Sequence, residues 1–447
     1  MSLFDEPLYH VTVLSNFARA FDKYTRHYRK SCIPESRYPA ESYLLPAAEL
    51  AVGVAKALRL CEKLKIPGDS LLALRAAVAR PNVLPNMGSG VGLVWPSPEL
   101  PVSGVYQIGA DATLGPRMPL EEAMAKSLAL HSGAFVDYAA LRPRSVSFLP
   151  IARGCQAACA FCFSEASVSS DQTHGALDIR VIDRWARLGK LRGAERAVIT
   201  GGGEPTLLPW QRTQELIRAC RRHFSKVVLI TNGVRLASLP ERESANLLHH
   251  LTSAGLSVLA VSRHHYQERT NADIMKLETW TPALLKVASA VRQQLPQLRI
   301  RLVCVLQRGG VESAADVNEY VCWATRLGVG EICFKELYVA ASEESVYYSR
   351  GANTWSARNQ VPLSVVHNWA TDNGFALTDR LPWGAPIFDG TIEGHSIRVA
   401  AYTEPSLFWE RSHGLARSWN VMSDGTCLAS LEDRRSNVAS TCAEVSH

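Results

Sequence analysis

The sequence lacks any apolar run of about 18 residues, the length that a membrane-spanning helix needs. Asp5 and Glu6 stand where a secretory signal would carry positive charge, so we expect a cytoplasmic protein with no membrane partner. A large excess of one charge is also missing, because 48 basic and 42 acidic residues give a net charge of +6. These charges are spread along the chain without a Lys- and Arg-rich stripe, which argues against nucleic acid as a partner.

An even number of cysteines is lacking as well, because the chain has 11 cysteines, and we see no export signal. We therefore expect no disulfide framework, and a metal or redox role for some of the cysteines. The rest of the composition, 47% hydrophobic and 20% charged, is typical of a globular chain.

From about residue 145 to 338, within a predicted barrel domain of residues 145–345, one unit recurs: a short β-branched run followed by an amphipathic helix. Near-continuous apolar strands that alternate with helices indicate a parallel sheet covered by helices. We predict an α/β fold, a partial (β/α)6 TIM-like barrel whose chemistry gathers at the C-terminal strand ends. The six expected strands are 145–149, 196–200, 226–231, 256–262, 299–306 and 331–337.

The flanking segments give weaker patterns. Residues 1–144 are predicted to be a mostly helical extension, with helical stretches around 8–30 and 46–64, and we assign them no chemistry. Residues 346–447 are predicted to form a small α+β cap over the substrate, with a helix at 362–373 and a hairpin turn at 423–425.

The strongest motif is a cysteine triplet directly after the first strand. Cys155, Cys159 and Cys162 form a CxxxCxxC pattern in a glycine-led loop. A structural zinc normally takes four protein ligands, and the ferredoxin pattern continues to a fourth nearby cysteine that is absent here. In a 4Fe-4S cluster, three ligands would leave the fourth iron open to a ligand that is not protein. A zinc knuckle completed by a distant His or Cys is the alternative.

This loop, with Phe161 before its last cysteine, resembles the signature of the radical S-adenosylmethionine (radical SAM) superfamily over about residues 145–338. The resemblance implies one 4Fe-4S cluster on the three cysteines, with S-adenosylmethionine chelated to the open iron and Phe161 among its contacts. It also implies reductive cleavage to a 5′-deoxyadenosyl radical that abstracts hydrogen from a substrate. An electron donor such as flavodoxin or ferredoxin would be a partner.

A second motif lies where the second strand ends. Gly201, Gly202, Gly203, Glu204 and Pro205 resemble the GGEP motif of the family, whose edge accepts hydrogen bonds from the methionine ammonium group. Glycines allow the backbone to approach a ligand closely. The alternative is a tight strand-to-helix turn, with Pro205 as the residue that starts the helix.

Later strand ends carry further candidates. The resemblance implies that Asn232 meets the ribose or the substrate, and that Ser262 contacts the methionine carboxylate or the ribose. Arg263 would neutralise that carboxylate. His264 and Tyr266 suit substrate hydrogen bonding or proton transfer, with solvated loop residues as the alternative.

On the sixth strand, Lys335 and Glu336 must point to opposite sides. We predict that Glu336 contacts substrate and that Lys335 points outward, the alternative being a salt bridge between strand and helix. This part resembles the branch that includes the molybdenum-cofactor GTP cyclase. That branch has auxiliary-cluster cysteines near its C-terminus, but here only Cys427 and Cys442 lie in the tail, so we expect one cluster.

Taken together, these motifs predict a radical SAM enzyme acting on a small polar metabolite in natural-product or cofactor biosynthesis. A maturase acting on a peptide or protein is a second hypothesis. A non-catalytic iron-sulfur or zinc protein is the third, and it would bind no S-adenosylmethionine.

Overall fold

The computed structural model describes residues 138–152, 154–163, 177–339, 345–347, 349–382, 385–405, 410 and 414–438. It also describes the backbone of seven strands between residues 8 and 118. Within the described residues, no helix combines the length and apolarity that a bilayer crossing requires.

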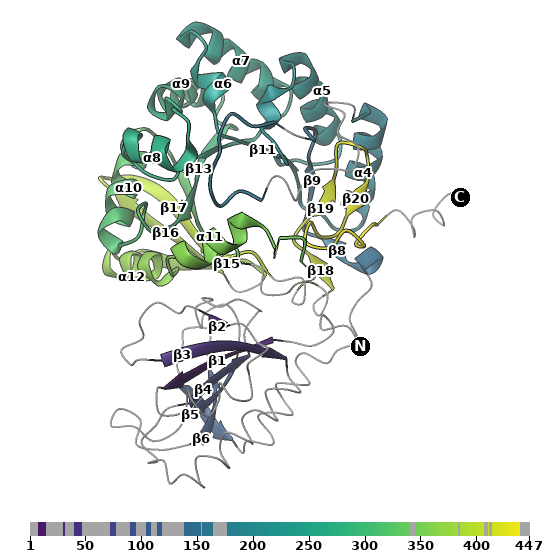
Figure 1. Cartoon of the computed structure of the whole chain (residues 1–447). Helices are drawn as coiled ribbons and strands as arrows, with labels where there is room; N and C mark the ends of the chain where they lie inside the picture. Colours follow the sequence, from purple (N-terminus) through teal and green to yellow (C-terminus); the bar gives the residue numbers. More distant parts are fainter. Residues whose placement is uncertain are drawn as a thin grey trace.

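Six parallel strands form the centre of the fold and confirm the predicted partial barrel (Figure 1). Each lies within two residues of its predicted bounds, because the β-branched runs bury both of their faces. The strands are β9 (Ser145–Phe148), β10 (Arg196–Ile199), β11 (Val227–Thr231), β12 (Val258–Ser262), β13 (Arg299–Leu306) and β14 (Glu331–Glu336).

Helices cover the outer face of the curved sheet (Figure 1). They include α4 (Ile179–Leu191), α5 (Trp210–Arg221), α6 (Val234–Ala237), α7 (Glu241–Ser253), α8 (Glu268–Met275), α9 (Thr281–Gln294) and α10 (Ala314–Arg326). Alternate side chains of the strands, such as Ile300 and Leu302, pack with Leu284 and Leu285 of α9 in the main core.

The other alternate side chains point into the barrel. Val198, Val228, Val258 and Ala260 form a separate buried apolar cluster, with Ile230 and Val303 packed against it.

The C-terminal segment extends the sheet at both edges, whereas the sequence predicted a cap. Strand β17 (His395–Tyr402) pairs in parallel with β14, and β19 (Trp419–Val421) pairs in parallel with β9. An open barrel leaves two edges of unpaired backbone, and these strands cover them.

The remaining elements of this segment are α11 (Gly351–Asn359), α12 (Ser364–Asp372), β15 (Ala376–Arg380), β16 (Pro386–Ile392), β18 (Leu415–Ala416) and β20 (Cys427–Leu428). Strand β18 pairs with β8 (Arg142–Pro143), which follows a short 3-10 turn at Tyr138–Ala140. The resulting sheet has 11 strands in the order β15-β16-β17-β14-β13-β12-β11-β10-β9-β19-β20. The predicted hairpin turn joins β19 to β20, where Asp424 Oδ1 accepts from Thr426 N at 2.9 Å.

The N-terminal extension contains strands where helix was expected. The stretch around 8–30 begins with β1 (Leu8–Leu14), so the helix prediction is wrong there, because β-branched Val11, Thr12 and Val13 favour a strand. Residue 30 begins β2 and residue 46 ends β3, so these two ends of the expected helices are also in strands. The rest of the expected helices lies outside the described residues. An antiparallel sheet has the order β2-β3-β1-β4 and a second one β5-β6-β7. Their members are β2 (Lys30–Ser31), β3 (Ala40–Pro46), β4 (Leu72–Ala76), β5 (Gly90–Val94), β6 (Gly104–Ile108) and β7 (Leu114–Met118).

Candidate active site

The cysteine loop follows β9 and is held by backbone hydrogen bonds from two other loops. Glu204 N, after β10, donates to Gly154 O at 2.8 Å. Ala158 N donates to the carbonyl of Met275, at the end of α8, at 2.9 Å. The triplet is therefore placed by the loops that follow β10 and β12 as well as by its own strand.

The three thiols interact with one another. Cys155 and Cys162 are exposed, Cys159 is half-buried, and all three are free of disulfides. Burial raises the pKa of Cys159 to about 12, and negative charge on Cys162 and Cys155 adds to the rise. Burial also raises the pKa of Cys155. A cationic cluster that takes all three sulfurs as thiolates would relieve this repulsion, so the donor set fits an iron-sulfur cluster.

No group of three His, Cys, Asp or Glu side chains in the described part of the chain converges as the ligands of a single metal ion would. In a 4Fe-4S cluster each thiolate binds its own iron, so the sulfurs need not converge on one point.

The glycine segment after β10 packs against the cysteine loop. A Cβ atom added to Gly203 would lie 2.1 Å from Gly154 O, and one added to Gly201 would lie 2.0 Å from Gly203 O. Any side chain at these positions would therefore displace backbone. Gly202 is buried between them.

Glu204 ties the ends of β10 and β11 together and is only 3% exposed. Its Oε1 accepts from Thr206 N at 2.9 Å and from the hydroxyls of Thr206 and Thr231 at 2.6 Å each. Its Oε2 accepts from Asn232 N at 2.8 Å. The carboxylate thus shapes the predicted binding edge, and any contact with S-adenosylmethionine would come from the backbone of this segment.

Asn232 lies beside the first cysteine. Its Nδ2 donates to Gln156 Oε1 at 3.1 Å and lies 3.7 Å from Cys155 Sγ, while its Oδ1 accepts from Val234 N at 3.0 Å. An N–H donor at a ligating sulfur tunes the potential of an iron-sulfur cluster. The sequence placed Asn232 in the site but gave no sign of this contact with sulfur.

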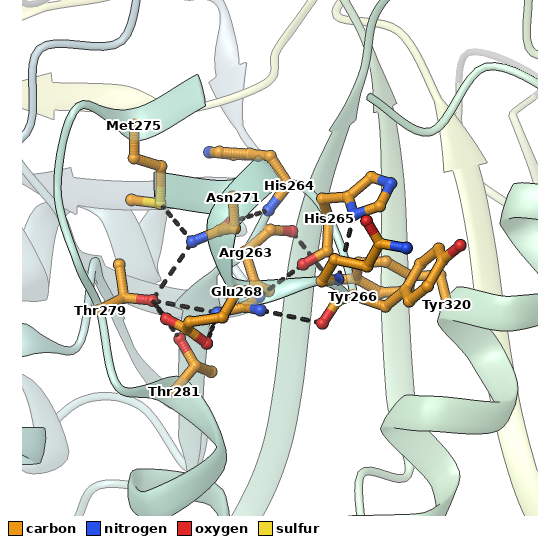
Figure 2. Close-up of polar contacts among 11 residues, drawn as sticks. Arg263, His264, His265, Tyr266, Glu268, Asn271, Met275, Thr279, Thr281 and Tyr320 are labelled. Atoms are coloured by element: carbon orange, nitrogen blue, oxygen red, sulfur yellow. Dashed lines mark hydrogen bonds and ion pairs between the residues drawn. The ribbon is translucent and has the colours of Figure 1, made fainter. Parts of the chain in front are cut away.

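Arg263 has a different environment from the one expected. Its side chain is fully buried, and its guanidinium donates to partners in its own loop (Figure 2). The acceptors are His265 O at 2.6 Å, Glu268 Oε2 at 2.8 Å, Tyr266 O at 3.0 Å and Thr279 Oγ1 at 3.2 Å. The expected neutralisation of the methionine carboxylate by Arg263 is therefore wrong, because the guanidinium is committed to these acceptors.

Asn271 joins His264, Thr279 and Met275 by hydrogen bonds (Figure 2). Its Oδ1 accepts from His264 N at 2.8 Å, and its Nδ2 donates to Thr279 Oγ1 at 3.2 Å and Met275 Sδ at 3.4 Å. Because the Met275 carbonyl holds Ala158, the network around Arg263 reaches the cysteines through α8.

His264 is buried against Phe161 of the cysteine loop. The two rings meet edge to face with centroids 5.1 Å apart, and His264 Nδ1 accepts from Val305 N at 3.1 Å. This contact assigns the proton of the neutral ring to Nε2. Burial and the nearby Arg263 charge lower the pKa of His264 to about 3. The His264 ring therefore stays neutral at pH 7, which does not fit the expected proton transfer. The other expected role, hydrogen bonding to substrate, fits a neutral ring that donates from Nε2.

We expect this burial to make the protein less stable in acid. Between pH 6.5 and 3 the unfolded chain binds a proton that folded His264 excludes, so the free energy of unfolding falls as the pH falls. The loss from this group is about 1.4 kcal/mol per pH unit. Urea unfolding at pH 7 and pH 5 measures it.

In His264→Asn, Oδ1 can still accept from Val305 N, and this part of the pH dependence should disappear. The matched change His250→Asn, at an exposed position of α7, should leave the dependence as it is. An unchanged slope in His264→Asn would show that the histidine is not buried as described.

A cavity of about 300 Å³ adjoins the cysteine loop. Phe161, Cys162 and Gly201 line one side, and Lys335 and Glu336 line another at the end of β14. The C-terminal segment supplies further walls, among them Glu404, Glu410, Arg417, Asn420 and Glu432. The sequence gave no signal for Glu404 or Arg417, because strands far apart in the chain bring them here.

Glu336 is 1% exposed and borders the cavity. Because side chains alternate along β14, an inward Lys335 directs the Glu336 side chain to the face of Phe334, so the contact of Glu336 with substrate stays a prediction. The expectation for Lys335 is wrong. Along β14, Lys335 alternates with buried Phe334 and shares the inward face with Cys333, so it lines the cavity and pairs with Glu404. Glu404 also pairs with Arg417.

Three other candidates are not among the residues that line this cavity: Ser262, His264 and Tyr266. Tyr266 stacks on His265 with ring centroids 4.4 Å apart and packs against the core. Ser262 is half-buried at the end of β12. The structure thus brings together the cysteines, Phe161, Gly201 and Glu336, and it sets Tyr266 and Ser262 apart.

Residues 149–306 match the family model of the Radical SAM superfamily. The chain therefore carries a radical SAM domain over these residues. The likeness to the GTP cyclase branch stays a prediction. No curated protein matches the sequence.

Similar solved structures include SuiB of Streptococcus suis bound to S-adenosylmethionine, with 15% identity and a TM-score of 0.42 over 69% of this chain and 65% of that chain. They also include a radical SAM methyltransferase from Sphaerobacter thermophilus, with 14% identity and a TM-score of 0.37 over 63% of this chain and 69% of that chain. A third is coproporphyrinogen III oxidase from Escherichia coli, with 13% identity and a TM-score of 0.36 over 53% and 54%. The chain thus spans about two thirds of the length of SuiB.

Proposed function

We propose that the protein cleaves S-adenosylmethionine reductively at one 4Fe-4S cluster held by Cys155, Cys159 and Cys162. The cluster, once reduced by an external electron donor, supplies the electron that splits the sulfonium into methionine and a 5′-deoxyadenosyl radical. The radical then takes a hydrogen atom from a small polar substrate. The observation that carries this proposal is that Cys162 borders the cavity together with Phe161 and Gly201.

The roles of the surrounding residues follow from their positions. Backbone groups of residues 201–203 would bind the methionine end of S-adenosylmethionine, and Phe161 would contact its adenosyl part. Asn232 would donate a hydrogen bond towards the sulfur of Cys155. Glu336, which borders the cavity, stays a predicted substrate contact.

The chemistry of the cavity lining favours a polar metabolite as the substrate. This lining mixes carboxylates, cations and aromatic rings, which suits a polar metabolite. A place in natural-product or cofactor biosynthesis is part of the same proposal.

The test is anaerobic reconstitution of the full chain with iron and sulfide, followed by reduction in the presence of S-adenosylmethionine. We expect formation of 5′-deoxyadenosine, measured by mass spectrometry. A reconstituted cluster that neither binds nor cleaves S-adenosylmethionine would favour the non-catalytic alternative. A mass change in a supplied precursor peptide, with no turnover of small molecules, would favour the maturase.

A further inference from the structure

The N-terminal end of the barrel interior carries a layer of basic side chains. Arg196 begins β10, Lys226 precedes β11, and Arg301 lies near the start of β13. Each stands two residues before a member of the inward-facing apolar cluster, Val198, Val228 or Val303 respectively. Because side chains alternate along a strand, all three cations belong to the inward face.

These cations outnumber the carboxylates beside them. Glu331 Oε1 accepts from Arg299 at 2.9 Å, and Glu331 Oε2 accepts from Arg301 Nε at 2.9 Å. Among the described residues, the carboxylate paired with Arg196 is that of Glu195, at 3.9 Å, and Glu195 also lies 3.6 Å from Arg144. In the described part of the chain, four cations (residues 196, 226, 299 and 301) thus lie beside two carboxylates, an excess of two positive charges.

The layer is confined enough for these charges to repel one another. Burial and the charges of Arg301, Arg299 and Arg196 lower the pKa of Lys226 to about 8. Burial, with Arg144 and Arg301, lowers the pKa of Arg196 to about 10. A charge excess of this kind costs folding free energy unless an anion is present.

We infer that this basic layer is a binding site for a small phosphate-type dianion. Arginine presents several donors in a planar fork that matches the oxygens of a phosphate group. The side chains of Arg196 and Arg301 are 23% and 22% exposed, so an ion can reach them from solvent. None of Arg196, Lys226 and Arg301 is among the residues that line the cavity beside the cysteines.

The test compares thermal unfolding and calorimetric titration of the full-length protein with sodium phosphate and with sodium chloride at equal ionic strength. We expect phosphate to bind and to raise the melting temperature of the wild type. In the double variant Arg196→Gln/Lys226→Gln, phosphate affinity should fall at least tenfold. Without phosphate this variant should melt no lower than the wild type, because a repulsion has been removed.

The matched control is Arg218→Gln/Lys286→Gln, which removes the same charge from exposed positions of α5 and α9. It should bind phosphate as the wild type does. An equal phosphate effect in both double variants, or no phosphate effect in the wild type, would overturn the proposal. So would a lower melting temperature of the Arg196→Gln/Lys226→Gln variant without phosphate, since the layer would then be a structural ionic network.

A second titration, with glycerol 3-phosphate, distinguishes the two sources of such a group. Binding at least tenfold tighter than that of inorganic phosphate would assign the site to a phosphomonoester. Equal or weaker binding would assign it to free phosphate. The site does not depend on the chemistry proposed for the cysteines, so neither result bears on the cleavage of S-adenosylmethionine.

Discussion

Replacing Cys155, Cys159 or Cys162 by alanine is expected to abolish both the iron-sulfur cluster and the formation of 5′-deoxyadenosine. Three thiolates are the fewest that can hold a 4Fe-4S cluster with one open iron, so no single ligand can be spared. Iron and sulfide content, visible absorbance and mass spectrometry of the reduced reaction measure the two losses separately. We expect each variant to lose cluster and cleavage together, because the cleaving electron comes from the cluster.

Cys322→Ala is the matched control, since this half-buried thiol lies on α10 outside the loop. It should keep full cluster content and cleavage. If any one of the three loop variants still cleaved S-adenosylmethionine, the ligand assignment would be refuted, and with it the proposed function.

The barrel could be predicted from the sequence because its signal is local. Most of the six strands are β-branched runs with at least one fully buried face, and helices with one apolar side alternate with them, as for Leu284 and Leu285 of α9. Ser313 and Asp316 form the capping box that begins α10, and this signal is local because the two residues are three positions apart in the sequence. The edges of the sheet could not be predicted in this way. Strands β17 and β19 join it through pairings with distant parts of the chain, and short strands carry little pattern of their own.

The same distinction between local and long-range signals applies to the candidate site. The cysteines, Phe161 and the glycine segment were found because a contiguous motif places them, and the loops that follow β9 and β10 lie against each other. Lys335 was placed on the wrong face, because the sequence shows that neighbours alternate but not which of them points inward. The family resemblance predicted that Arg263 neutralises the methionine carboxylate, and the sequence alone does not show what surrounds the guanidinium. Only the folded loop shows four acceptors around its guanidinium.

The second prediction with a large effect concerns this loop: we expect Arg263→Lys to destabilise the protein. The guanidinium of Arg263 donates hydrogen bonds to four acceptors, whereas a lysine has a single ammonium group. In Arg263→Lys some of the buried oxygens would therefore lose their donors. Breaking a buried charged network of this kind costs about 3 to 5 kcal/mol. We expect a fall of that size in the free energy of unfolding, measured by urea denaturation at pH 7.

The same variant separates a positioning role from a ligand role. If Arg263 holds the loop, S-adenosylmethionine should bind the folded, reconstituted variant with nearly its normal affinity at low temperature. Arg269→Lys, the same change at an exposed position of α8, should alter neither property. An Arg263→Lys variant with normal stability but at least tenfold weaker binding would instead place the guanidinium on the methionine carboxylate. Because Asn271 and Met275 join this loop to Ala158, we also expect the unstable variant to lose its cluster faster on warming than the control does.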